Sequence, residues 1–155
     1  MNSPATILKV FVYGTLKPGE ANYKIYCQGK TIAETPAYIR GELYQLSRGY
    51  PAVCQGNRKI TGYLLEFIVP REQSPEDCHV LRQLDQLEDY QKNRPTKFNE
   101  YYRLQVKTFD PNDNFLDYAW CYFMTQDQIL SLKGKVILDN KWQSFHSKQA
   151  TFLQN

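Results

Sequence analysis

The segment that decides the fold runs Val10-Phe11-Val12-Tyr13-Gly14-Thr15-Leu16-Lys17-Pro18-Gly19. Its apolar, β-favouring start predicts a buried strand over residues 8–13, and the glycines and proline that follow predict a tight loop. Successive backbone N–H groups in such a loop can form a concave nest that binds an anion. Gly14 has no Cβ, so a ligand and the backbone can approach closely there. Taken alone, an ordinary strand followed by an ordinary turn is the simpler explanation of the segment.

The length and composition of the chain are typical of a single domain. Its 155 residues suffice for a sizeable core, and the 12 Tyr and 8 Phe favour strands. The formal charge of +3, with basic and acidic residues interspersed, predicts no nucleic-acid partner, although a few basic groups could attract a small acidic substrate. No apolar run is long enough to span a membrane, and the first residues do not resemble a signal peptide. We therefore expect a cytoplasmic protein.

The cysteines and histidines give no sign of a metal site. None of the four cysteines has C-x-x-C or zinc-finger spacing, so we expect reduced, mostly buried thiols at Cys27, Cys54, Cys78 and Cys121. His79 and His146 lack a nucleophile motif around them, and we expect structural or surface roles for both.

Apolar alternation and turn residues divide most of the chain into strands. Residues 31–46 predict two strand pieces bent near Pro36 or Gly41, and Gly62 marks a bulge or a crowded position. The other expected elements are a loop or short helix over 20–30, strands over 52–54, 60–69, 101–109 and 116–124, turns at 55–57 and 111–114, and a loop over 91–99. The tail from Gln126 has a short amphipathic segment, followed by Trp142 and Phe145.

One segment has the pattern of a helix. Ser74 is a candidate N-cap, Pro75 suits the first helical position, and leucines at helical spacing continue to Leu87. Strands, one helix, then more strands predict an α+β domain with a mainly antiparallel sheet that can close on itself. The same order argues against a Rossmann-type βαβ fold.

The helix ends at a second candidate site, Leu84-Asp85-Gln86-Leu87-Glu88-Asp89-Tyr90. A carboxylate at Glu88 lies near the negative end of the helix dipole and beside apolar neighbours. Both effects raise the pKa of a carboxyl group, and Asp85 and Asp89 act in the same direction if they lie close. Such a group can exchange a proton near neutral pH. A solvated acidic helix end is the simpler alternative.

Together, these segments resemble the gamma-glutamylcyclotransferase-like family. The opening signature is Tyr13-Gly14-Thr15-Leu16, and the Leu84–Tyr90 segment resembles the family's Leu-Asp-x-x-Glu-Gly-Tyr block. Other matching blocks, in the correct order, are Arg40-Gly41-Glu42-Leu43-Tyr44, Gly49-Tyr50-Pro51-Ala52, Ile60-Thr61-Gly62-Tyr63-Leu64-Leu65-Glu66, Tyr102-Arg103 with Val106, and Ala119-Trp120-Cys121-Tyr122. The blocks span about residues 8–124, and the tail over 125–155 matches only faintly, at Asn140-Lys141-Trp142.

The resemblance implies a single domain over residues 1–155, a small β-barrel with flanking helices. It implies that backbone amides of Tyr13, Gly14, Thr15 and Leu16 bind the substrate carboxylate and that Glu88 is the catalytic acid/base. Tyr50, Tyr102 and Tyr122 are possible pocket residues, and no metal or organic cofactor is required. Asp89 departs from the family pattern, which has Gly. If that position is left-handed, Asp tolerates it better than most residues, but its charge puts substrate choice in doubt.

The implied reaction cyclises a γ-glutamyl group to 5-oxoproline and releases an amine. It is an intramolecular acyl transfer, and the release of the amine resembles a lyase reaction. The leaving amine and the oligomeric state cannot be read from the sequence. Two other classes remain open: a regulatory module that binds a small acid without turnover, and an interaction protein with a tyrosine-rich surface. The second requires the Tyr13 loop and Glu88 to lie far apart. Tyr101-Tyr102-Arg103 and Trp142 are either ligand contacts or packing residues, with packing preferred.

Overall fold

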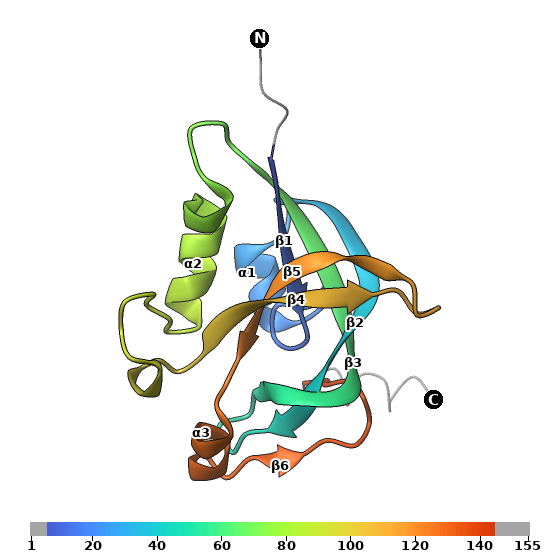
Figure 1. Ribbon diagram of the computed structural model, residues 1–155, viewed down its shortest axis with the longest axis vertical. Coiled ribbons are helices and arrows are strands. Elements are labelled where there is room, and N and C mark those ends of the chain that lie inside the picture. The colour runs from blue at the N-terminus through green and yellow to red at the C-terminus, as the bar shows by residue number, and fades with distance from the viewer. Residues whose placement is uncertain (1–5, 145–155) are drawn as a thin grey trace.

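A computed structural model describes residues 6–144, which form an α+β fold built on one six-stranded sheet. The strand order is β3-β1-β5-β4-β2-β6, and β3 also pairs with β2 (Figure 1). The strands are β1 Thr6–Val12, β2 Thr31–Gln45, β3 Pro51–Val69, β4 Tyr102–Phe109, β5 Phe115–Phe123 and β6 Lys135–Val136. The α-helices are α1 Ala21–Tyr26, α2 His79–Leu87 and α3 Gln126–Ser131, and short 3-10 helices cover η1 Pro75–Asp77 and η2 Thr96–Phe98.

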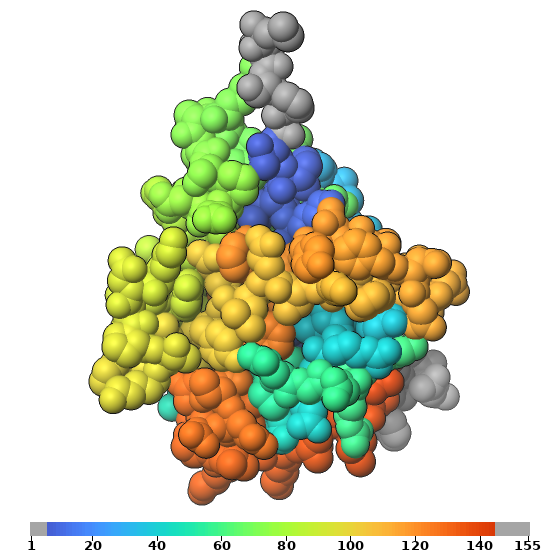
Figure 2. All heavy atoms as spheres, viewed as in Figure 1, coloured from blue at the N-terminus to red at the C-terminus, as the bar shows by residue number. Residues whose placement is uncertain are grey.

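The sheet is mainly antiparallel, as the sequence predicts. The long strands β2 and β3 pair with each other, β1 pairs with β3, and β4 pairs with β5, all antiparallel. One parallel pairing joins β1 to β5, through Val10 and Trp120. Figure 2 shows the β4–β5 hairpin (yellow to orange) crossing the face of the molecule over residues of β2 and β3.

The second half of strand β1, from Val10 to Val12, is buried on both faces, which explains its apolar sequence. Leu8, Val10 and Val12 pack into a core cluster that also contains Leu81 and Leu84 of helix α2. The alternate residues Phe11 and Tyr13 pack into a second cluster, formed mainly by β2, β3 and β5. Since side chains alternate along a strand, an apolar run such as this one marks a central strand with protein on both sides.

The predicted turn at residues 55–57 is wrong. These residues belong to β3, which is continuous from Pro51 to Val69. The register shifts there, because Gly41 is opposite Arg58 whereas Glu42 is opposite Cys54. The extra residues form a bulge, and β2 pairs with β3 on both sides of it. Strand β2 is likewise one strand with an irregularity at Gly41 rather than two separate pieces.

The predicted helix begins later than expected. Residues Pro75–Asp77 form a 3-10 turn, and α2 starts at His79 after an extended Cys78. Ser74 is the N-cap of this 3-10 turn and Pro75 is its first residue, but the Ser74 side chain makes no capping bond. Cys78 is buried, and its thiol lies 3.7 Å from the Pro75 carbonyl oxygen. Cys78 is thus a buried, extended residue that separates the two helical segments.

Several smaller expectations are confirmed. Gly62 is a crowded position, since a Cβ there would lie 2.1 Å from the Val12 carbonyl oxygen. All four cysteines are buried free thiols, and Trp142 is a buried anchor. His79 is exposed, whereas Phe145 and His146 lie outside the described residues. Over residues 6–144, none of the helices has both the length and the apolar character needed to cross a bilayer.

Candidate active site

A cavity of about 260 Å³ opens where β1 ends, beside the C-terminal end of α2. This volume is close to the small end of ligand pockets, roughly 300–1,000 Å³. Its wall combines backbone from the Tyr13 loop with side chains from distant segments: Phe11, Val12, Tyr13, Gly14, Thr15, Leu16, Asn22, Tyr50, Pro51, Leu87, Glu88, Glu100, Tyr101 and Tyr122.

The Tyr13–Leu16 loop is a tight turn fixed to the start of α1. The Lys17 N–H donates to the Gly14 carbonyl over 3.0 Å, and the Asn22 N–H donates to the Thr15 carbonyl over 2.9 Å. The Asn22 side-chain amide also donates to the Thr15 hydroxyl. Across residues 6–144, the N–H groups of Gly14, Thr15 and Leu16 donate no hydrogen bond to the protein. These donors are therefore available to an anion in the cavity.

Packing around the loop explains why Gly14 is a glycine. A Cβ there would lie 2.6 Å from Cγ of Pro51, so the close approach is to a neighbouring side chain rather than to a ligand alone. On the other side, the buried Lys17 ammonium donates to the Trp142 carbonyl. Burial lowers the pKa of Lys17. The loop is thus held by β3 and by the C-terminal segment.

Glu88 lies at the C-terminal cap of α2, with its carboxyl group in the cavity wall. Its N–H donates to the Leu84 carbonyl, and its carbonyl accepts from the Tyr101 N–H. Within the described part of the chain, the carboxylate has no hydrogen-bond or ion-pair partner. The residue is partly exposed, but surrounding protein desolvates the carboxyl group. Desolvation, followed by the charges of Glu100 and Asp85, raises the pKa of Glu88 to about 8.

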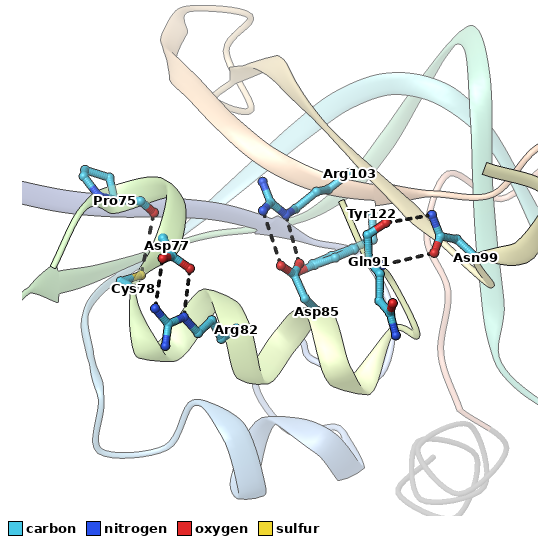
Figure 3. Close-up of polar contacts among 9 residues, drawn as sticks. All are labelled: Pro75, Asp77, Cys78, Arg82, Asp85, Gln91, Asn99, Arg103 and Tyr122. Carbon is cyan, nitrogen blue, oxygen red and sulfur yellow. Dashed lines mark hydrogen bonds and ion pairs between the residues drawn. The ribbon is translucent and has the colours of Figure 1, made fainter. Parts of the chain in front are cut away.

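Asp85, one helical turn earlier, has the opposite environment (Figure 3). Its carboxylate accepts from Nε and Nη2 of Arg103 at 2.9 and 3.3 Å and from the Tyr122 hydroxyl at 2.7 Å. The guanidinium of Arg103 also lies 4.3 Å from the centre of the Trp120 ring. This buried network pairs the Asp85 carboxylate with Arg103 and joins α2 to strands β4 and β5. It holds the end of the helix that carries Glu88.

Asp89 has the left-handed conformation that the family's glycine implies, with a φ of 53°. Its carboxylate accepts from Arg94 at 3.0 Å. Of the two neighbours expected to raise the pKa of Glu88, Asp85 does so, whereas Asp89 is not among the causes. Glu100, which sequence reasoning did not single out, supplies the other negative charge.

Most of the residues predicted for the site meet in one cavity. Tyr13, Gly14, Thr15 and Leu16 lie in its wall with Glu88, Tyr50 and Tyr122. Tyr102 does not line it; its ring lies 6.1 Å from that of Phe123, among the residues of the second core cluster. Since neighbouring residues of a strand face opposite sides, the cavity receives Tyr101 and not Tyr102.

Sequence reasoning missed the polar wall residues Asn22 and Glu100, and it preferred packing over ligand contact for Tyr101, which also lines the cavity. The Tyr101 hydroxyl donates to the Pro51 carbonyl over 2.7 Å, and the Tyr50 hydroxyl donates to Glu100 over 2.5 Å. The only available signal for Glu100 was its position directly before the predicted strand over residues 101–109. Asn22 lies in a segment whose sequence carried no such signal.

The chain is similar to known proteins of one family. The profile of the family described as Gamma-glutamyl cyclotransferase, AIG2-like, matches residues 10–144. The chain is 26% identical over 145 residues to a Gamma-L-glutamyl-butirosin B gamma-glutamyl cyclotransferase of Niallia circulans, covering 94% of this chain and 81% of that protein. It is 34% identical over 80 residues to a Vibrio cholerae protein named as a gamma-glutamylcyclotransferase, covering 52% of this chain and 61% of that one.

The fold is also similar to solved structures. An AIG2-like protein from Mus musculus superimposes with a TM-score of 0.61, at 19% identity and 88% coverage of both chains. At this identity the likeness concerns the fold alone, whereas the family profile covers most of the chain. The protein is therefore a member of the AIG2-like gamma-glutamyl cyclotransferase family.

Proposed function

We propose that this protein cyclises the γ-glutamyl group of a small amide to 5-oxoproline and releases the amine. One observation carries the proposal: Glu88 and the free N–H groups of the Tyr13–Leu16 loop line the same cavity. An acid/base and an anion anchor in one small pocket are the two groups that this reaction requires. The same juxtaposition argues against the interaction-protein alternative, which needs the two segments apart.

The anchor step uses backbone rather than side chains. The substrate's α-carboxylate accepts from the N–H groups of Gly14, Thr15 and Leu16, which donate nothing within the described chain. Binding there directs the α-ammonium group toward Glu88 and folds the γ-carbonyl back over it. Because nucleophile and electrophile belong to one molecule, orientation supplies a large part of the rate.

Glu88 then relays protons from the attacking nitrogen to the leaving nitrogen. Its carboxylate takes a proton from the α-ammonium, and the freed lone pair forms a bond to the γ-carbonyl carbon. As the tetrahedral intermediate collapses, Glu88 returns that proton to the leaving nitrogen and the bond from the carbon to this nitrogen breaks. The ring nitrogen then passes its second proton, through the same carboxylate, to the released amine, which departs as an ammonium ion. A carboxyl pKa of about 8 lies close to that of an amine, so each transfer costs little free energy.

The direct test measures 5-oxoproline released from a panel of γ-glutamyl amides by the purified protein. Glu88→Gln keeps the side-chain shape but cannot exchange a proton, so we expect kcat to fall by about 10²–10⁴-fold. The matched control is Glu76→Gln, in the exposed turn before α2, which should keep wild-type turnover. Unchanged turnover in Glu88→Gln would overturn the proposal.

The non-catalytic alternative predicts a different pair of results. A regulatory pocket would be stabilised by 5-oxoproline or γ-glutamyl ligands in a thermal-shift assay, with no product released by the wild-type protein. We also propose that the sheet closes into a barrel, which the pairing of β3 with both β1 and β2 supports. A single domain and a cytoplasmic location are two further proposals.

A further inference from the structure

Helix α1 is bonded directly to the Tyr13–Leu16 loop, and one of its residues, Asn22, lines the cavity. The first N–H groups of a helix have no partner within it and are often capped by a side chain. In α1 the side chain of the N-cap residue Glu20 makes no capping bond. Instead, the N–H groups of Asn22 and Tyr23 both donate to the Thr15 carbonyl, over 2.9 and 3.2 Å. The loop therefore caps the helix, and the helix fixes the loop.

These backbone bonds determine where the N–H groups of the loop point. In a trans peptide, the carbonyl of one residue and the N–H of the next point in opposite directions. Because the Thr15 carbonyl is directed at α1, the Leu16 N–H is directed away from the helix. In the same way, the Gly14 carbonyl accepts from the Lys17 N–H, which directs the Thr15 N–H away from that turn. Two of the N–H groups proposed to bind the carboxylate are thus oriented by bonds on the opposite side of their peptides.

The Asn22 side chain adds a contact that the helix backbone does not supply. Its amide nitrogen donates to the Thr15 hydroxyl over 2.9 Å. Both residues are half-buried, so water competes less for this bond than it does at the surface. Asn22 thus holds Thr15 at two points, the carbonyl and the hydroxyl. A loop that is held in its binding conformation before the ligand arrives binds that ligand at a lower entropic cost.

We infer that Asn22 is a positioning residue that preorganises the Tyr13–Leu16 loop for the substrate's carboxylate, and that its side chain acts through the Thr15 hydroxyl. The inference rests on the proposed function, because that function assigns the carboxylate to this loop. Asn22 determines the affinity for the carboxylate, whereas proton transfer belongs to Glu88.

Two ring compounds test this role. 5-Oxoproline has the carboxylate that the loop is proposed to bind, and 2-pyrrolidone is the same ring without it. Ligand-observed NMR gives the dissociation constants of both compounds for the wild type and each variant. Asn22→Ala and Thr15→Val each remove one partner of the side-chain hydrogen bond. We expect each to weaken 5-oxoproline binding about three- to tenfold and to leave 2-pyrrolidone binding unchanged.

Three further variants separate positioning from other effects. If Asn22 and Thr15 act through one bond, the double variant Asn22→Ala/Thr15→Val binds 5-oxoproline no more weakly than either single variant. Thr15→Ser keeps the hydroxyl and should bind 5-oxoproline more tightly than Thr15→Val does. Gln28→Ala removes an exposed amide just after α1, outside the cavity, and should keep the wild-type dissociation constants.

Unchanged 5-oxoproline binding in Asn22→Ala overturns the inference. A loss in Asn22→Ala without one in Thr15→Val also overturns it, because Asn22 would then contact the ligand itself. Additive losses in the double variant, or equal weakening of both ring compounds, would show a general change in the cavity and overturn it as well. Wild-type protein that neither binds nor releases 5-oxoproline overturns the proposed function and the inference together. Turnover by a wild type whose variants bind 5-oxoproline equally well overturns the inference alone.

Discussion

The two ends of helix α2 each carry an Asp–Arg ion pair, and the pairs differ in environment rather than in geometry (Figure 3). Near the N-terminal end, Arg82 Nε lies 2.8 Å from Asp77, and the side chains are 63% and 68% exposed. Near the C-terminal end, Arg103 Nε lies 2.9 Å from Asp85, and the side chains are 8% and 18% exposed. If one partner of the exposed pair is lost, water solvates the charge that remains. Water cannot do this for the buried pair.

The difference shows that the buried polar groups lie at the end of α2 that carries the site. The C-terminal end of α2 carries Glu88 into the cavity, and the Asp85 network fixes that end against β4 and β5. The Asp77–Arg82 pair near the N-terminal end faces solvent, and neither residue lines the cavity. A buried ion pair seldom stabilises a fold more than apolar side chains packed in its place. The Asp85–Arg103 pair is therefore better explained as positioning the end of α2 that carries Glu88.

The largest expected effect on stability follows removal of Arg103. Arg103→Met leaves the Asp85 carboxylate buried without its cation, and we expect a loss of about 3–5 kcal/mol in the free energy of unfolding. Urea denaturation measures it. Arg82→Met is the matched control at the exposed end, where we expect no measurable change. Equal losses of stability in the two variants would show that the two ion pairs do not differ in environment. Adding Asp85→Asn to Arg103→Met should recover much of the loss.

Glu88 gives the second effect, which depends on pH. Its folded pKa of about 8 lies above the ordinary value of 4.5, so the folded protein binds this proton more tightly than the unfolded chain does. The resulting stability is complete below about 4.5 and is lost as the pH rises through 8. Glu88→Gln cannot ionise and should be more stable than wild type by a few kcal/mol above that range, with no such gain at pH 4.

Denaturation curves of both proteins from pH 4 to pH 9 provide the measurement. The exposed Glu76→Gln variant, from the other end of the α2 region, should run parallel to wild type throughout. A gap between wild type and Glu88→Gln that did not widen with pH would show that Glu88 is solvated like Glu76.

The smallest expected effect comes from the third member of the Asp85 network. Tyr122→Phe removes one hydrogen bond to a carboxylate that keeps its arginine, so we expect a loss of about 1–2 kcal/mol in the free energy of unfolding. The ring still lines the cavity. Tyr118→Phe, at an exposed position of the same strand, is the control and should leave the denaturation midpoint unchanged. A loss as large as that of Arg103→Met would place the tyrosine, and not the arginine, at the centre of the network.

The sequence by itself determined the features that depend on a few neighbouring residues. The apolar run before Tyr13 predicted a buried strand, Gly14 a tight loop, and the leucine spacing a helix ending at Glu88, whose carboxyl pKa was expected to be raised. Strand burial, turn formation and helix dipoles act over a few residues, so their signals are local.

Tertiary structure alone decided which distant groups share the cavity. It brought Glu100 and Tyr101 to Glu88, placed Tyr102 on the other side of its strand, and paired Asp85 with Arg103. It also converted the expected turn at 55–57 into a bulge, because pairing with β2 continued beyond it. These contacts join segments far apart in the chain. Burial, which determines how strongly each charge acts on its neighbours, arises only once those segments have packed.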